Sequence, residues 1–141
     1  MKDLSAISKY WCSYTHKKFL EADLVGSEHA VLMSLSLDDY VTQDAISSHL
    51  VLDKGTIAKT LAKLEEKELV NRIVNNKNKR EKIVSLTEKG KSEVQKVYDI
   101  AKQWDTSIWK GISVEEQSVF LAVLAKITDR AKILADQEKG N

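Results

Sequence analysis

The absence of proline is the sequence feature that most constrains the fold of this chain. Its 141 residues include no proline and only five glycines, so few positions can interrupt a helix. Hydrophobic residues make up 43% and charged residues 30% of the sequence, a balance typical of folded rather than disordered chains. We expect one mainly α-helical domain, because a chain of this length is too short for two ordinary ones.

The cysteine count and the lengths of the apolar runs indicate in which cellular compartment the protein resides. Cys12 is the single cysteine, so the chain cannot form an intramolecular disulfide. The N-terminus, MKDLSAISKYW, lacks the basic and then apolar layout of a signal peptide. No run approaches the roughly 18 apolar residues of a membrane-spanning helix. The sequence predicts a cytoplasmic protein that does not reside in a membrane.

Hydrophobic periodicity and capping residues predict the order of the elements. Apolar residues at helical spacing predict helices over about 3–22, 28–37, 43–50 and 54–69, and two long helices that follow Thr87 and Ser113. The β-branched segments 70–75 and 82–87 flank a polar tip and predict a hairpin. Ser27, Thr42 and Asp53 stand where N-caps are expected. The expected fold is mainly α with a small β-hairpin wing: a winged helix-turn-helix between long terminal helices.

Positive charge is concentrated in the middle of the chain. Residues 53–91 contain 11 Lys or Arg against 6 Asp or Glu, whereas the counts are 4 and 7 in residues 1–52 and 7 and 8 in residues 92–141. Such a concentration favours a polyanionic partner such as nucleic acid, although a solvated lysine-rich surface would give the same counts.

The helix over 54–69 and the hairpin tip are the candidate DNA-binding elements. Ile57, Leu61 and Leu64 form the predicted buried stripe, and the opposite face is short-chained and basic. Short residues let a helix backbone approach the major groove, while lysines reach base edges and phosphates and the tip reaches an adjacent minor groove. The predicted contacts are Lys54, Gly55, Thr56, Ala58, Lys59 and Lys63 on the helix, and Lys77, Lys79 and Arg80 at the tip.

The stretch from Leu52 to Gly90, LDKGTIAKTLAKLEEKELVNRIVNNKNKREKIVSLTEKG, resembles the signature region of MarR (multiple antibiotic resistance) regulators. It matches their pattern L-D-K/R-S/G-T, then L-E, then a basic wing, then T-x-x-G, in order and spacing. Lys59 stands where the family usually has arginine, which keeps the charge without bidentate geometry. Asn78-Lys79-Arg80 replaces Asp-Arg-Arg, and Glu68 replaces the usual glycine.

Both the terminal helices and the resemblance predict a homodimer. The terminal helices cannot bury Trp11, Trp104, Phe120 and Leu134 efficiently within so small a domain. The resemblance implies a winged-helix part over about 27–90 and dimerisation helices over about 1–24 and 88–138. It also implies two recognition helices about one DNA turn, roughly 34 Å, apart on a palindromic operator.

Three further roles have competing interpretations. Tyr10, Trp11 and Tyr14 could line a pocket for a small aromatic or phenolic effector, as in similar regulators, or could simply pack in the core. Arg72 could pair with an effector carboxylate or form an intramolecular salt bridge. Cys12 could sense oxidants, as in some relatives, or could be an ordinary buried apolar residue.

The sequence offers no sign of a catalytic or metal centre. The three histidines fall on three different predicted helices without ligand spacing, and we find no phosphate loop or nucleophile elbow. We therefore expect no cofactor. The prediction is a sequence-specific DNA-binding repressor that an effector releases. The alternatives are a winged-helix protein-interaction module without DNA binding and a cysteine-based redox-sensing regulator, with an enzyme a distant third.

Overall fold

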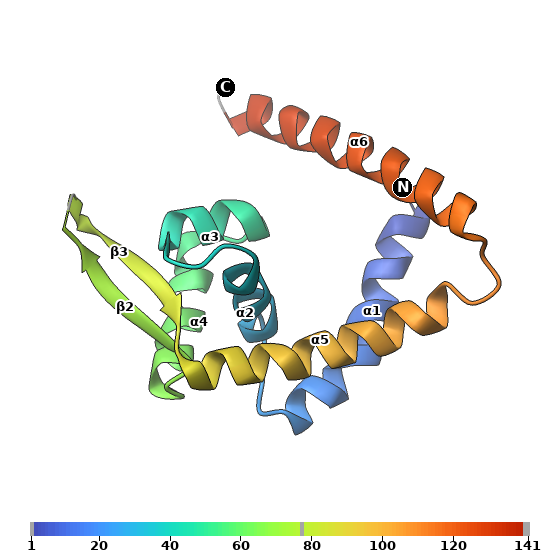
Figure 1. Cartoon of the computed structure of the whole chain (residues 1–141). Helices are drawn as coiled ribbons and strands as arrows, with labels where there is room; N and C mark the ends of the chain where they lie inside the picture. The colour runs from blue at the N-terminus through green and yellow to red at the C-terminus, as the bar shows by residue number, and fades with distance from the viewer. Residues whose placement is uncertain (1, 77, 140–141) are drawn as a thin grey trace. The chain divides into compact units, whose positions relative to one another are not determined.

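Six helices and three strands make up the described part of the chain, residues 2–76 and 78–139 of this computed structural model (Figure 1). In chain order they are α1 (Lys2–Glu21), α2 (Glu28–Leu37), β1 (Val41–Thr42), α3 (Gln43–Leu50), α4 (Lys54–Glu66), β2 (Val70–Asn75), β3 (Asn78–Leu86), α5 (Glu88–Ile108) and α6 (Val114–Lys139). The prediction of a mainly helical fold with a small hairpin wing is confirmed.

The chain divides into two compact units, residues 1–104 and 105–141. The first unit holds the hydrophobic core, which draws side chains from α1 to α5 and from the hairpin. The predicted stripe of α4, Ile57, Leu61 and Leu64, is fully buried in it. The face of α4 opposite this stripe is therefore turned away from the core.

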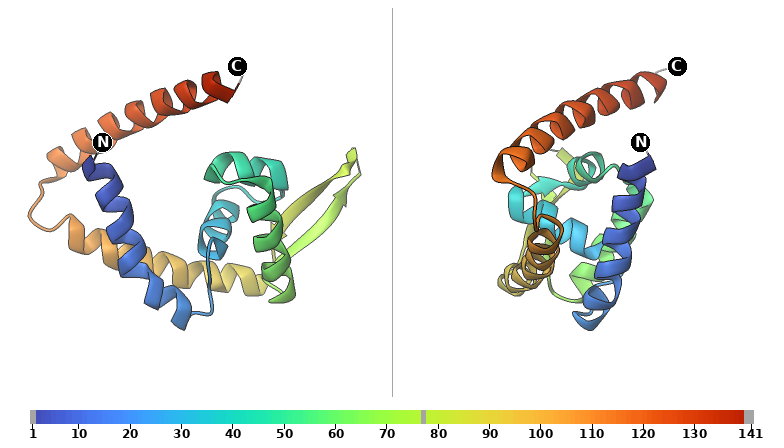
Figure 2. Two further views of the ribbon diagram at one scale, coloured as in Figure 1. Left: turned by 180° about the vertical axis from the view of Figure 1, so that it is seen from behind. Right: turned by 90° about the vertical axis from the view of Figure 1, so that its right-hand side faces the viewer.

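The sheet is antiparallel, with the strand order β1-β3-β2. β1 pairs only with Ile83 and Val84, near the root of the hairpin, so the outer hairpin is a two-stranded ribbon. This ribbon projects beyond α2, α3 and α4 (Figure 2). We predicted the second strand over 82–87, but β3 begins at Asn78. The reason is that backbone pairing, as between Asn75 and Asn78, extends into the polar tip without apolar side chains.

The end of α4 corrects the predicted boundary at Leu69. The helix ends at Glu66, and the N–H groups of Glu68 and Leu69 donate to the carbonyls of Glu65 and Leu64 at 2.9 and 2.8 Å. Glu68 has a φ of 61°. This is the Schellman arrangement that commonly ends helices, with a left-handed residue for which glycine is usual.

The second unit consists of the end of α5, a turn and α6. A capping box begins α6: Ser113 N–H donates to Glu116 Oε2 at 2.9 Å, and Glu116 N–H donates to Ser113 Oγ at 3.2 Å. Trp109 packs edge-on against Phe120, with ring centroids 5.7 Å apart. Many apolar side chains of α6 are exposed, because the unit contains no other element long enough to cover them. No helix among the described residues is long and apolar enough to cross a membrane.

Candidate nucleic-acid interface

The turn between α3 and α4 is closed by a buried serine. Val51 has a left-handed backbone with a φ of 54°, and Leu52 N–H donates to the Ser47 carbonyl at 3.1 Å. The Ser47 hydroxyl donates to the Leu52 carbonyl at 2.6 Å. These bonds fix the angle between the two helices of the helix-turn-helix.

The first turn of α4 is held by its N-cap. Asp53 accepts hydrogen bonds from the Thr56 N–H at 2.8 Å and from the Thr56 hydroxyl, and these two bonds lower the pKa of the Asp53 carboxyl. A Cβ added at Gly55 would lie 3.1 Å from Asp53 Oδ1, so a side chain there would crowd the cap. Gly55 is exposed, while Thr56 and Ala58 are half-buried.

The three predicted lysines of α4 are all exposed, but they differ in their partners. Lys54 forms an ion pair with Asp44 of α3, with 2.7 Å between Nζ and Oδ2. Lys59 and Lys63 are one turn apart on the same side of the helix, and neither forms an ion pair with a described residue. Lys59 and Lys63 are therefore the two α4 cations that are available to an external anion.

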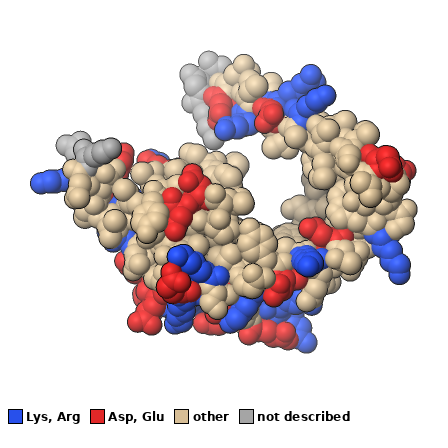
Figure 3. Space-filling model, viewed as in Figure 1, with Lys and Arg blue, Asp and Glu red and all other residues tan. Residues whose placement is uncertain are grey.

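Much of the positive charge of residues 53–91 is paired within the molecule. Among the described side chains of this segment, five basic ones form ion pairs: Lys54, Lys67, Arg72, Lys89 and Lys91. On the face drawn in Figure 3, the described Lys and Arg side chains lie among Asp and Glu and form no continuous basic patch. The segment charge thus overstates the charge that a partner would meet.

The wing is tied to α4 at its root. Arg72 of β2 donates to Glu65 of α4 through Nε, at 2.9 Å from Oε2, and through Nη2. This pairing lowers the pKa of the Glu65 carboxyl. At the outer end, Lys79 is exposed. Lys77 and the side chain of Arg80 lie outside the described residues, so their predicted DNA contacts are not placed.

Arg72 therefore forms the intramolecular salt bridge that was one of its two interpretations. It also lines a polar hollow of about 290 Å³ together with Thr42, Gln43, Asp44, Glu81 and Lys82. An effector contact by Arg72 stays a prediction.

The aromatic residues of α1 divide between packing and exposure. The rings of Trp11 and Tyr14 lie 5.6 and 5.3 Å from that of Trp104, between centroids, and Trp11 also meets Phe19 edge-on. Tyr10 is 67% exposed. Packing accounts for Trp11 and Tyr14, and the effector role of all three residues stays a prediction.

Cys12 and the histidines have distinct environments. Cys12 is exposed, so its interpretation as a buried apolar residue is wrong, and redox sensing stays a prediction. His29 stacks on Phe19 with centroids 4.1 Å apart. Within the described ranges, no group of three His, Cys, Asp or Glu side chains could hold a metal ion.

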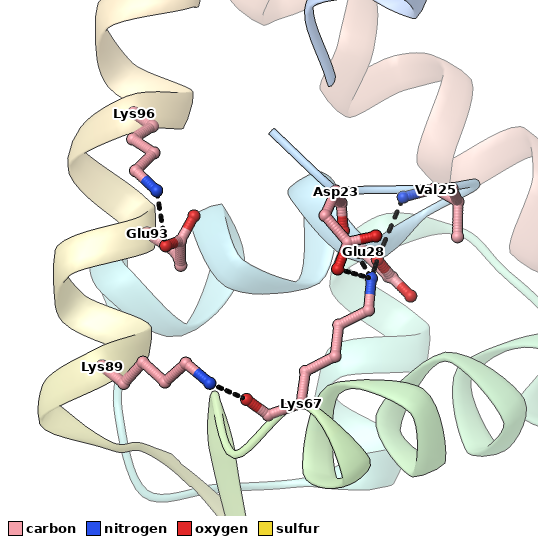
Figure 4. A network of polar contacts seen from close by, with 7 residues as sticks. All are labelled: Asp23, Val25, Glu28, Lys67, Lys89, Glu93 and Lys96. Atoms are coloured by element: carbon pink, nitrogen blue, oxygen red, sulfur yellow. Dashed lines mark hydrogen bonds and ion pairs between the residues drawn. The ribbon is translucent and has the colours of Figure 1, made fainter. Parts of the chain in front are cut away.

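Sequence reasoning missed the contacts behind α4. We predicted that Ser27 caps α2, but its side chain makes no cap hydrogen bond and instead lies 2.9 Å from Thr60 Oγ1, between hydroxyls. Glu28 is buried and pairs with Lys67, with 2.8 Å between Oε2 and Nζ (Figure 4). These partners lie 33 and 39 residues apart, so no local spacing pattern could have revealed them.

With this geometry established, the chain can be compared with known proteins. The family model described as "MarR family" matches residues 26–82, which include the helix-turn-helix and most of the wing. Residues 26–82 form a MarR-family segment. The transcriptional regulator HosA of Escherichia coli O127:H6 is 29% identical over 105 residues, covering 74% of this chain and 78% of HosA. The regulator SarZ of Staphylococcus aureus is 36% identical over 72 residues, covering 51% and 49%.

Solved structures of transcriptional regulators share the fold over almost the whole chain. A MarR transcriptional regulator from Methanosarcina mazei Go1 has a TM-score of 0.84 and 27% identity, covering 94% of this chain and 96% of that one. The transcriptional regulator SlyA has a TM-score of 0.86 and 21% identity, covering 93% and 92%. A MarR-family regulator from Listeria monocytogenes, complexed with 26mer DNA, has a TM-score of 0.88 and 21% identity, covering 93% and 87%.

Proposed function

We propose that this MarR-family regulator binds double-stranded DNA through α4 and the hairpin wing. The observation that carries the proposal is the outward face of α4, where Lys59 and Lys63 are exposed, form no ion pair with a described residue, and follow a first turn that contains Gly55 and Thr56. Short side chains let the helix enter a major groove, and the lysines then reach phosphates or base edges. The DNA complex of the Listeria regulator, which has the same fold, supports this use of the fold.

The wing supplies the second contact in this proposal. Its outer ribbon carries exposed Lys79, and Lys77 and Arg80 belong to the same tip by sequence. The Arg72–Glu65 ion pair links the wing to α4, so the two elements meet DNA in a fixed relation. Arginine and lysine at a wing tip suit the negative potential of a minor groove.

The functional molecule is, in this proposal, a cytoplasmic homodimer that represses transcription from a palindromic operator. The exposed apolar side chains of α6 support dimerisation, since a second copy would remove them from water. Release by a small aromatic or phenolic effector would require that the effector favour a dimer geometry that does not fit DNA. The PcaV regulator of Streptomyces coelicolor, a fold neighbour, is solved in complex with its natural ligand.

A salt-titrated gel shift with DNA from upstream of the coding region tests DNA binding. Lys59→Ala and Arg80→Ala should each weaken binding and reduce the slope of log affinity against log salt by about one, as the loss of a phosphate contact does. Lys96→Ala is the matched control, because Lys96 lies on α5 and pairs with Glu93. Unchanged affinity and slope in both variants would show that Lys59 and Arg80 do not contact DNA. Retention by the wild type at low salt only would leave the protein-interaction module as the better explanation.

A further inference from the structure

The segment 23–28, which joins α1 to α2, contacts α4 and its C-cap at two points. The Ser27 hydroxyl lies 2.9 Å from Thr60 Oγ1, and the Thr60 hydroxyl donates to the Thr56 carbonyl at 2.9 Å. Lys67, the C-cap residue, contacts the same segment. Thr60 and Lys67 are seven residues apart, which is about two helical turns, and so lie on the same side. The two contacts together fix how α4 is rotated about its axis.

The Lys67 ammonium contacts this segment at two residues, Asp23 and Glu28. Its ammonium lies 2.8 Å from Glu28 Oε2, donates to the Asp23 carbonyl and lies 3.5 Å from the Asp23 carboxylate (Figure 4). Two of the three N–H donors of the ammonium are used in hydrogen bonds to Asp23 and Glu28, and the Asp23 carboxylate adds an ion pair. The Lys67 carbonyl in turn accepts from Lys89 Nζ of α5 at 2.8 Å. One residue therefore connects the end of α4 to two other parts of the unit.

The segment is in turn fixed to the end of α1. Leu24 N–H donates to the Phe19 carbonyl at 2.8 Å, and Asp23 N–H donates to the Leu20 carbonyl at 3.0 Å. Asp23 has a φ of 55°, as in a Schellman helix end. The turn from α1 into the segment is thus held by the backbone, and a displacement of α1 would be passed to Glu28.

The hydrogen bonds of Glu28 differ from those expected of a buried carboxylate that only stabilises the fold. It is 1% exposed, and its Oε2 accepts from Val25 N–H at 3.0 Å and from Lys67. Its Oε1 has no hydrogen-bond partner among the described residues. A buried carboxylate with an unsatisfied oxygen costs stability, and buried ion pairs can instead select one arrangement of the elements around them.

We propose that Glu28 and Lys67 are positioning residues that set the orientation of α4 relative to α1. This inference rests on the proposed function. In a dimer built on the terminal helices, the pair determines the spacing and angle of the two recognition helices, and so which half-site separation the protein accepts. Neither residue contacts DNA in this proposal.

Operators with altered half-site spacing test the proposal. The operator is first selected from random DNA with the wild type, and then variants of its spacer that are one base pair shorter, one longer and two longer are measured by fluorescence anisotropy. The wild type should prefer its own spacer by at least about tenfold, since each half-site must meet a recognition helix. In Lys67→Met and Glu28→Gln the preference should fall to within about threefold. Lys67→Arg should restore it, because the guanidinium keeps the charge and the donors.

The controls separate positioning from stability and from DNA binding itself. Lys96→Met, which loses an ion pair on α5, should keep the wild-type spacer preference. Glu28→Gln keeps an acceptor for Val25 N–H, so the spacer preference of this variant can be measured even if Lys67→Met does not fold. An unchanged preference in the folded variants would overturn the inference, whatever happens to their melting temperatures.

If the wild type binds no DNA at any spacer length, the proposed function fails. Hydrogen exchange then tests whether the Glu28–Lys67 pair positions α4. Lys67→Met or Glu28→Gln should speed exchange in segments 23–28 and 54–66 at least about threefold relative to α3. Equal acceleration in α3, or no acceleration, would overturn the inference.

Discussion

At the scale of single residues, Glu68 has a backbone conformation that suits glycine better. Its φ is 61°, a region in which a Cβ costs roughly 1–2 kcal/mol. Its ion pair with Lys89 spans 3.7 Å at the surface and contributes little. Glu68→Gly should raise the free energy of unfolding by about 1 kcal/mol in urea titrations. Glu66→Gly, at the last helical position of α4, should lower it by a similar amount; a loss in both variants would contradict this explanation.

His29 should make stability depend on pH. Burial lowers the pKa of His29 from 6.5, against the opposing effects of a hydrogen bond to the Gly26 backbone and of the Glu28 charge. The unfolded chain therefore binds this proton more tightly, and stability should fall as pH drops through about 6.5 towards the lower folded pKa. His29→Phe keeps an aromatic ring against Phe19 and should remove this slope between about pH 7 and 5. His16→Gln, at an exposed position, should retain it in thermal melts over the same range.

At the scale of elements, Gly90 determines how closely α5 approaches the root of the wing. A Cβ at Gly90 would lie 2.0 Å from the Leu69 carbonyl oxygen and 3.2 Å from Leu86 Cδ2. The backbone must shift to admit it, so Gly90→Ala should destabilise the first unit by about 1–3 kcal/mol in urea titrations. Ser92→Ala, at an exposed site on α5, should change the free energy of unfolding by less than about 0.5 kcal/mol. A near-neutral Gly90→Ala would mean that the two elements do not meet this closely.

Contacts between residues that are close in the sequence could be predicted for these elements, whereas contacts between residues far apart in the sequence could not. The caps at Thr42, Asp53 and Thr87 each act within three residues, and all three were predictable from local spacing. The Glu28–Lys67 pair and the pairing of β1 with β3 join residues about 40 positions apart. A single sequence carries no periodic signal for such contacts, so Ser27 was assigned to its local helix rather than to Thr60.

At the scale of the whole molecule, the net charge differs from the charge that is available to a partner. The +1 of the chain hides a basic middle segment, but internal ion pairs occupy Lys54, Lys67 and Arg72 within it. Fewer cations then remain for an external anion. In the dimer proposed above, affinity would come from linking two half-site contacts rather than from strengthening one.

Assembly of two copies should therefore control DNA affinity. Phe120, Ile127 and Leu134 recur every seven residues along α6 and are 42%, 42% and 63% exposed, a spacing that places them on one side. Ile127→Glu with Leu134→Glu should shift a dimer to monomers in sedimentation velocity and weaken operator binding at least about a hundredfold, because the half-sites are no longer linked. Lys132→Glu, about 140° around the helix from Ile127, should leave the dimer intact. A double variant that stays dimeric with full affinity would place the dimer interface elsewhere.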